Sequence, residues 1–189
     1  MNSILTLTLA ALIGGWFSFK KAPAKVGDET LSNNIYDYSF TDIDGKHVKL
    51  SHFKGKKIMF VNVASMCGNT PQYEQLEAMS KKYADKLVIL GFPCNQFGFQ
   101  EPKGKDSIKD FCTKKYGVTF TLSDKIDVKG SNQYPIYKWL TQKSLNGVMD
   151  SEVKWNFQKY LIDEHGHFVQ MFAPKMKPDD PSIIAAIEK

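Results

Sequence analysis

The sequence predicts an α/β fold in which helices flank a central mixed β-sheet. Residues 57–64 and 87–92 are two short, continuous apolar runs, typical of strands that are buried on both faces. Between them, residues 73–83 carry apolar side chains at helical spacing. A strand, a helix and a second buried strand form a unit whose strands are expected to be parallel, with a right-handed crossover.

The segment before this unit predicts an N-terminal β-hairpin. Residues 35–41 and 46–50 flank an Asp-Ile-Asp-Gly turn, and an Asp-Gly pair between two short strands is typical of a tight turn. The crossover helix is expected to start at Thr70 and Pro71, because threonine is a favoured N-cap and proline is tolerated in the first helical turn.

The elements after the second buried strand complete one domain. Further helices are expected at residues 107–115, 135–143 and 182–188. A second hairpin is expected from strands at 159–163 and 168–172, which flank a Glu-His-Gly-His turn. The chain has 189 residues and no repeat or low-complexity segment, so we expect one domain over residues 35–189.

The N-terminal segment has a different character. Residues 4–19 are an almost unbroken apolar run, which is shorter than the roughly 20 residues of a membrane-spanning helix. It matches the core of a signal peptide, and Ala-Pro-Ala at 22–24 is a small-residue cleavage site. Two lysines follow the run and also suit an uncleaved anchor. We expect residues 1–21 to be a signal peptide or membrane anchor and residues 22–34 to be a polar linker.

This interpretation predicts an exported protein, either periplasmic or anchored to a membrane through its N-terminus. If the segment is a frayed terminal helix and not a signal, the protein is cytoplasmic.

The charge pattern argues against nucleic acid as a partner. The 25 basic residues are all lysines, they are mixed with 20 acidic residues, and the net charge is +5. Recognition of phosphates and base edges favours the forked guanidinium of arginine, which the chain lacks. We therefore expect a solvated surface of mixed charge.

Three cysteines, Cys67, Cys94 and Cys112, are too few and too widely spaced for a disulfide framework. There is no Cys-x-x-Cys pair, and the four histidines do not have zinc-site spacing. No metal or cofactor is expected, so the surroundings of each thiol must decide its role.

Cys67 is the best candidate for a reactive thiol. It lies between a buried strand and the predicted helix start, and the pKa of a thiol falls near helix N-termini and hydrogen-bond donors. Gly68 leaves room for a small substrate. A structural core cysteine is the alternative, but it fits poorly in a polar Gly-Asn-Thr turn. The absence of a second cysteine at position 70 argues against dithiol exchange.

Three segments carry a family resemblance. Residues 61–73 (VNVASMCGNTPQY), 90–102 (LGFPCNQFGFQEP) and 153–157 (VKWNF) resemble, in the same order, three signature segments of the glutathione peroxidase family. The similarity extends from about residue 37 to the C-terminus. It implies a thioredoxin-like fold, reduction of hydrogen peroxide and organic or lipid hydroperoxides, and a catalytic tetrad of Cys67, Gln100, Trp155 and Asn156.

The residue types of this tetrad suit peroxide chemistry. Gln100 and Asn156 offer amide N–H donors, and Trp155 offers an indole N–H. Donors directed at the sulfur would stabilise a thiolate and then the oxyanion that leaves when the O–O bond breaks. Taken singly, each residue also suits a structural role. The best-known family members have selenocysteine at the attacking position, so the cysteine here implies a slower first step.

Cys94 and Cys112 are the remaining thiols. Cys94 ends a buried strand and is interpreted as inert. Cys112 shares a helical face with Ile108 and Phe111, so a core role is the alternative to function. Its Phe-Cys-Thr segment is similar to the one that carries the resolving cysteine in thioredoxin-dependent relatives. The resemblance thus implies a Cys67–Cys112 disulfide, which we expect to require partial unwinding of helix 107–115.

The expected reductant is thioredoxin or a related dithiol protein. Arginine holds the carboxylates of glutathione best, and none is present. The short region between Gly117 and Trp155 resembles the monomeric branch of the family, so we expect a monomer. Three alternatives stay open: a glutathione-dependent one-cysteine peroxidase, a membrane-tethered thiol–disulfide oxidoreductase, and a non-catalytic thioredoxin-like binding or metal-carrier module.

Overall fold

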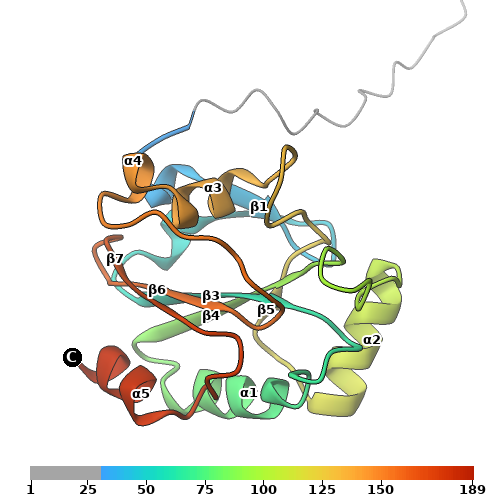
Figure 1. The fold of residues 1–189 in the computed structure, drawn as a ribbon. Helices are drawn as coiled ribbons and strands as arrows, with labels where there is room; N and C mark the ends of the chain where they lie inside the picture. The colour runs from blue at the N-terminus through green and yellow to red at the C-terminus, as the bar shows by residue number, and fades with distance from the viewer. Residues whose placement is uncertain (1–30) are drawn as a thin grey trace, which may run out of the picture.

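The computed structural model describes residues 31–189, which Figure 1 shows as a sheet between two layers of helices. The predicted signal peptide or anchor (1–21) and residues 22–30 of the predicted linker lie outside the described residues. Among residues 31–189, no helix has the length and apolar character needed to cross a membrane.

The central sheet has five strands in the order β5-β4-β3-β6-β7. The strands are β3 (Lys57–Val63), β4 (Leu87–Pro93), β5 (Thr121–Leu122), β6 (Lys159–Ile162) and β7 (Phe168–Phe172). β3 pairs parallel with β4, and β4 with β5, whereas β6 runs antiparallel to both β3 and β7. The predicted mixed sheet and its parallel strand–helix–strand unit are confirmed.

Helices cover both faces of this sheet (Figure 1). One face carries α1 (Gln72–Lys82), α2 (Lys105–Tyr116) and α5 (Pro181–Glu188). The other carries α3 (Pro135–Thr141), α4 (Lys143–Asn146), two short 3-10 helices, η1 (Ile35–Asp37) and η2 (Leu50–Phe53), and the predicted hairpin, β1 (Ser39–Thr41) with β2 (His47–Lys49). The hairpin therefore precedes the sheet in sequence and packs beside one of its helical layers.

β3 shows why the sheet needs two helical layers. Its side chains alternate between the faces, so Met59 and Val61 join the hydrophobic cluster of α1, α2 and α5. Ile58 and Phe60 join the opposite cluster, which contains α3 and η1. All four side chains are 0% exposed. The prediction that the continuous apolar run at residues 57–64 forms a strand buried on both faces is therefore confirmed.

Two predicted elements differ from the structure. The helix predicted at 135–143 is two helices, because Gln142 adopts an extended conformation (φ −114°, ψ 119°). The Asn146 side-chain amide donates to the Trp139 carbonyl at 3.1 Å. It thus replaces the backbone N–H that would donate to this carbonyl if the helix continued. Residues 35–37 form a 3-10 helix instead of strand, since the side chain of Asn34 accepts the Tyr36 N–H at 3.1 Å.

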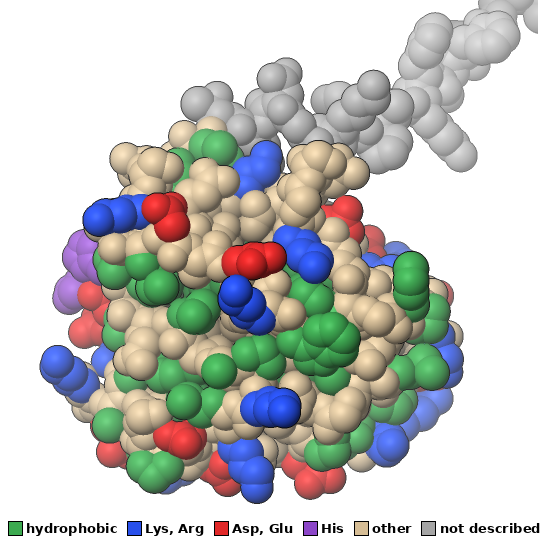
Figure 2. Space-filling model, in the orientation of Figure 1, with side chains coloured by type: hydrophobic (Ala, Val, Ile, Leu, Met, Phe, Trp, Pro, Cys, Tyr) green, Lys and Arg blue, Asp and Glu red, His purple; other side chains and the backbone are tan. Residues whose placement is uncertain are grey.

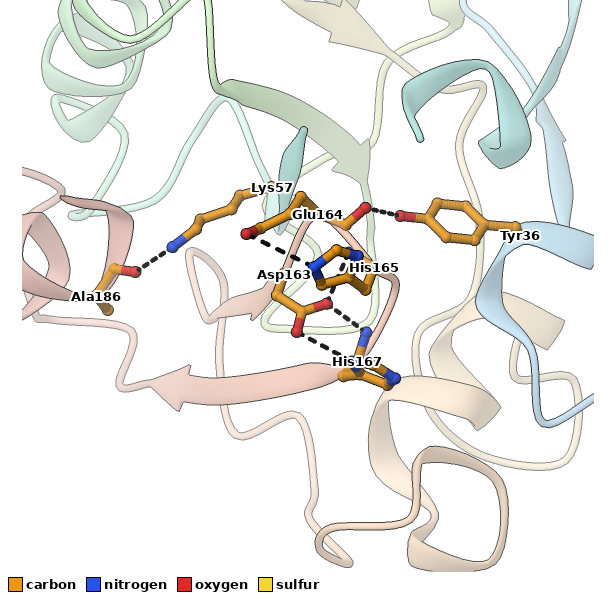
Figure 3. A network of polar contacts seen from close by, with 7 residues as sticks. All are labelled: Tyr36, Lys57, Asp163, Glu164, His165, His167 and Ala186. Atoms are coloured by element: carbon orange, nitrogen blue, oxygen red, sulfur yellow. Dashed lines mark hydrogen bonds and ion pairs between the residues drawn. The ribbon is translucent and has the colours of Figure 1, made fainter. Parts of the chain in front are cut away.

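The turn between β6 and β7 is a polar junction (Figure 3). The Asp163 carboxylate accepts the N–H groups of His165 and His167 at 2.9 and 2.7 Å. The Tyr36 hydroxyl donates to the Glu164 carbonyl at 3.0 Å and thereby ties η1 to this hairpin. Nearby, the Lys57 ammonium donates to the Ala186 carbonyl of α5 at 3.2 Å. These contacts hold the end of the sheet opposite to the Cys67 turn.

Lysine and acidic side chains are interspersed on the face drawn in Figure 2, without one dominant basic patch. This view agrees with the mixed-charge surface that the composition predicts.

Candidate active site

Cys67 lies in the turn between β3 and α1. Its side chain is 7% exposed, and its sulfur accepts the main-chain N–H of Asn69 at 3.3 Å. The Cys67 carbonyl accepts the N–H of Thr70 at 3.0 Å, so one tight turn separates the thiol from the first turn of α1. The thiol is therefore close to the N-terminus of α1, as the sequence predicts.

The predicted N-cap role of Thr70 is wrong. Its hydroxyl accepts the N–H of Cys67 at 3.0 Å and donates to the Ala64 carbonyl at 2.8 Å. Both bonds lie inside the turn, and α1 begins later, at Gln72. Thr70 consequently fixes the backbone of Cys67 instead of the helix end, because its hydroxyl is already engaged on both sides.

Gln100 and Asn156 lie together beside this turn. The Asn156 amide nitrogen donates to the Gln100 side-chain oxygen at 3.0 Å. The main-chain oxygen of Gln100 accepts the Met66 N–H at 3.0 Å, and that of Asn156 accepts the side chain of Asn69 at 3.3 Å. Because the side-chain oxygen of Gln100 is occupied, its amide nitrogen is the end left to donate elsewhere.

Trp155 forms one wall of a pocket at the thiol. The pocket has a volume of about 460 Å³ and is lined by Cys67, Gly68, Asn69, Trp155 and residues 173–175. The indole is 39% exposed and packs against Phe97, with the ring centroids 5.7 Å apart. The main-chain oxygen of Trp155 accepts the Asn62 amide at 3.0 Å, which anchors the loop to β3.

The structure thus gathers the predicted tetrad around one turn. Within residues 31–189, the hydrogen bond that reaches the Cys67 sulfur comes from the main chain of Asn69. Donation to the sulfur by Gln100, Trp155 and Asn156 stays a prediction. Gly98 lies beside the site with φ +65°, a backbone conformation that residues with side chains rarely adopt. A Cβ atom there would be in ordinary van der Waals contact with the Trp155 ring at 3.6 Å and with the Gln100 amide nitrogen at 3.7 Å, so the backbone conformation is what favours glycine.

Comparison with known proteins decides the family. A model of the glutathione peroxidase family matches residues 35–141. A hydroperoxy fatty acid reductase of Synechocystis sp. is 46% identical over 84% of this chain and 96% of the relative. A glutathione peroxidase-like peroxiredoxin of Saccharomyces cerevisiae is 47% identical over 78% of this chain and 92% of the relative. The chain belongs to the glutathione peroxidase family. It is a thiol peroxidase, an oxidoreductase that reduces hydroperoxides.

A solved structure agrees with this assignment. The crystal structure of Trgpx in apo form is 38% identical, with a TM-score of 0.63, and the match covers 82% of this chain and 96% of that one. This likeness, together with the mixed sheet between helical layers, confirms the thioredoxin-like fold that the resemblance implies.

Two features of this candidate site are not predicted from the sequence. The sequence places Asn69 only in a polar turn, whereas in the structure its main-chain N–H contacts the Cys67 sulfur and its side chain contacts the Asn156 main-chain oxygen. Residues 173–175 form a pocket wall from more than a hundred positions away in the chain. Asn69 had a local signal, its place in a turn beside the thiol, whereas no local pattern connects residues 173–175 to Cys67.

Glu101 supports the turn from inside the protein. It is 0% exposed, and one carboxylate oxygen accepts both the main-chain N–H and the hydroxyl of Ser65, at 2.8 and 2.9 Å. Burial raises the pKa of this carboxyl, and the two bonds from Ser65 oppose that effect. Ser65 lies two residues before Cys67, so Glu101 holds the loop that carries the thiol.

Cys112 and Cys94 lie in apolar surroundings. Cys112 is 0% exposed within α2, and burial raises its pKa to about 11, although an interaction with Tyr73 opposes the effect. Cys94 is also 0% exposed, and burial raises its pKa. All three cysteines are free thiols in this structure, and residues 31–189 contain no cluster suited to a metal ion.

Proposed function

We propose that Cys67 is the residue that attacks the hydroperoxide. Its sulfur takes the terminal oxygen, the O–O bond breaks, and the leaving oxygen takes a proton to become an alcohol, or water when the substrate is hydrogen peroxide. Sulfur is oxidised to a sulfenic acid. The observation that carries the proposal is the position of the Cys67 sulfur in a pocket, with the Asn69 N–H on it and the Gln100–Asn156 pair beside its turn.

The neighbouring donors suit both stages of this step. The main-chain N–H of Asn69 and the free amide nitrogen of Gln100 can stabilise a thiolate before the reaction and the departing oxygen during it. The indole N–H of Trp155 is a third donor in the same pocket. None of these groups titrates near neutrality, so the donors persist across the physiological pH range.

Cys112 is proposed to resolve the sulfenic acid. Its thiol attacks the Cys67 sulfur, a disulfide forms and the sulfenic oxygen leaves as water. A thiol with a pKa of about 11 inside a folded helix is a poor nucleophile, so α2 must open first. Two features support local opening of α2. It buries few residues, Ile108 and Cys112, and its N-cap residue, Gly104, has no side chain that could form a capping hydrogen bond.

Hydrogen exchange of α2 in the two redox states tests this opening. The expected result is faster exchange of residues 105–116 after oxidation of Cys67. Equal protection in both states would contradict local unwinding.

The proposed reductant is thioredoxin or a related dithiol protein, which would take the disulfide back to two thiols. The absence of arginine and the yeast relative named a peroxiredoxin support this choice over glutathione. The proposed substrates extend from hydrogen peroxide to organic and lipid hydroperoxides. The pocket, which Trp155 and Pro174 line, and the relative named a hydroperoxy fatty acid reductase support the larger substrates.

An NADPH-coupled assay tests both proposals. The wild type should turn over hydroperoxide much faster with thioredoxin and thioredoxin reductase than with glutathione and glutathione reductase. Cys67→Ser should remove turnover with either reductant. A faster rate with glutathione, kept in Cys112→Ser, would instead establish the one-cysteine alternative.

The N-terminal segment gives a separate proposal on location. We propose that residues 1–21 export the protein or tether it to a membrane, and that the enzyme domain works as a monomer. The apolar run and the small-residue site after it support export. Mass spectrometry of the mature N-terminus after expression in the native host checks cleavage, and a chain that starts at Met1 in the soluble cytoplasmic fraction would contradict both forms of the proposal.

A further inference from the structure

Lys159 is a buried lysine next to the active-site pocket. It is the first residue of β6, four positions after Trp155, and its side chain is 0% exposed. Burying an ammonium group is costly unless polar groups surround it. The peroxide chemistry proposed for Cys67 does not use this lysine, so its place in the interior needs another explanation.

Three oxygen atoms surround the Lys159 ammonium. It donates to the side-chain oxygen of Gln72, to the Pro174 carbonyl at 3.2 Å and to the Met176 carbonyl. Gln72, the first residue of α1, also donates its amide nitrogen to the Pro174 carbonyl at 2.9 Å. Lys159, Gln72 and Pro174 therefore form a closed triangle of hydrogen bonds that joins β6, α1 and the loop after β7.

The three acceptors match the charged form of the lysine. Burial lowers the pKa of Lys159 to about 7. An ammonium carries three N–H bonds and a neutral amine only two, so three acceptors favour the ammonium. A shorter or apolar side chain at this position would leave the carbonyls of Pro174 and Met176 without this donor in the interior.

The loop that Lys159 holds is a wall of the peroxide pocket. Ala173, Pro174 and Lys175 line the pocket together with the Cys67 turn and Trp155. β7 ends at Phe172, whose backbone pairs with Lys159 itself. The lysine thus fixes the chain at the point where it leaves the sheet and turns into the pocket.

We propose that Lys159 is a positioning residue that holds the 173–176 loop against the pocket and so sets the preference of Cys67 for organic hydroperoxides over hydrogen peroxide. The organic part of a large hydroperoxide needs a pocket wall, whereas hydrogen peroxide needs only the sulfur and its donors. This inference rests on the proposed reaction of Cys67 and adds the control of substrate preference.

The test compares Lys159→Met with a matched control, Lys57→Met. Lys57 also donates from the sheet to a backbone carbonyl, that of Ala186, but at the opposite end of β3 from Cys67. Stopped-flow tryptophan fluorescence measures the second-order rate of Cys67 oxidation by cumene hydroperoxide and by hydrogen peroxide. Dividing the two rates cancels any change in folded fraction or thiolate fraction.

In Lys159→Met, the ratio of the cumene hydroperoxide rate to the hydrogen peroxide rate should fall by about tenfold, the scale expected when a substrate loses part of an apolar pocket. In Lys57→Met it should keep the wild-type value. An unchanged ratio in Lys159→Met, or equal losses with both peroxides, would overturn the proposal.

A second variant covers the case in which Lys159→Met does not fold. Gln72→Leu removes one acceptor of the lysine and one donor to Pro174, and it should lower the same ratio in the same direction. An unchanged ratio in a folded Gln72→Leu protein would also overturn the proposal. The Cys67→Ser variant tests separately whether Cys67 attacks the hydroperoxide. If another residue attacks, Cys67→Ser will still be oxidised in the same assay.

Discussion

Cys67 and Cys112 contribute to the same hydrophobic cluster on one face of the sheet, but the elements that carry them differ. Cys67 lies in a turn, accepts a main-chain N–H and opens into a pocket. Cys112 lies inside α2, 0% exposed, with a pKa that burial raises to about 11. We therefore expect opposite reactivity from two thiols of one hydrophobic cluster, because hydrogen-bond donors and solvent access control thiol reactivity more than position in the fold does.

The comparison also supports the proposed order of events. A thiol held in a pocket with donors can react first, and a thiol buried in a helix can react only after the helix opens. Two residues of α2 are buried, so we expect its opening to cost less free energy than unfolding of the sheet.

The largest expected effect is the loss of the first thiol. Cys67→Ser should lower the rate of oxidation by hydrogen peroxide by at least about a thousandfold, because a hydroxyl is a far weaker nucleophile than a thiolate. Stopped-flow fluorescence with excess hydrogen peroxide measures the rate. Cys94→Ser is the matched control and should react like the wild type, since Cys94 is buried away from the pocket. Rapid oxidation of Cys67→Ser would assign the attack to another residue.

Loss of the second thiol should separate the two half-reactions. Cys112→Ser should keep its first oxidation rate within about twofold, while turnover with thioredoxin falls by about a hundredfold, because no disulfide forms for thioredoxin to reduce. The unresolved Cys67 should then accumulate as sulfinic acid, which intact-mass spectrometry detects. Full turnover of Cys112→Ser with thioredoxin would remove Cys112 from the mechanism and leave Cys67 untouched.

A smaller effect is expected from a donor near the first thiol. Gln100→Leu should slow oxidation of Cys67 by roughly tenfold to a hundredfold, since it removes one proposed donor to the thiolate and to the leaving oxygen and breaks the bond with Asn156. Gln75→Leu, an amide of α1 that bonds Asp179 at 3.3 Å, serves as the control and should leave the rate unchanged. Equal rates for Gln100→Leu and wild type would show that Asn69 and the turn suffice.

The smallest effect concerns pH and the second thiol. In the unfolded chain a thiol has a pKa of about 8.5, and burial raises that of Cys112 to about 11. The folded state therefore holds the Cys112 proton more tightly than the unfolded chain does. The resulting stabilisation of the fold is fully present below the pKa of the unfolded chain, and it is lost as the pH rises towards the pKa of the folded state. Relative to Cys112→Ser, the wild type should lose about 1.4 kcal/mol of unfolding free energy per pH unit in this window.

Urea denaturation of both proteins at pH 8 and pH 10, under reducing conditions, measures this difference. A difference that does not change with pH would mean that Cys112 is more exposed, or better supplied with donors, than the structure indicates.

Local patterns in the sequence were sufficient for the centre of the fold. The apolar runs of β3 and β4 are buried as predicted, and Cys67 lies between β3 and α1 because that order is local in the chain. The grouping of Gln100 and Asn156 followed from family resemblance, since no periodicity relates two residues 56 positions apart.

Long-range side-chain contacts explain what could not be predicted. Lys159 meets Gln72 across 87 positions, and its burial contradicts what an isolated lysine in a strand indicates. Thr70 resembled an N-cap because its type and position were right, but Ala64 and Cys67 already occupy its hydroxyl. The break at Gln142 depends on a side-chain bond from Asn146, which the helical pattern does not encode.

Disulfide mapping tests whether Cys67 is oxidised first and Cys112 then resolves it. The reduced full-length protein is treated with one equivalent of hydroperoxide, quenched with an alkylating agent, digested and analysed by mass spectrometry. We expect a Cys67–Cys112 disulfide with Cys94 alkylated. A disulfide that contains Cys94, or a Cys67 sulfenic acid that persists beside an alkylated Cys112, would contradict it.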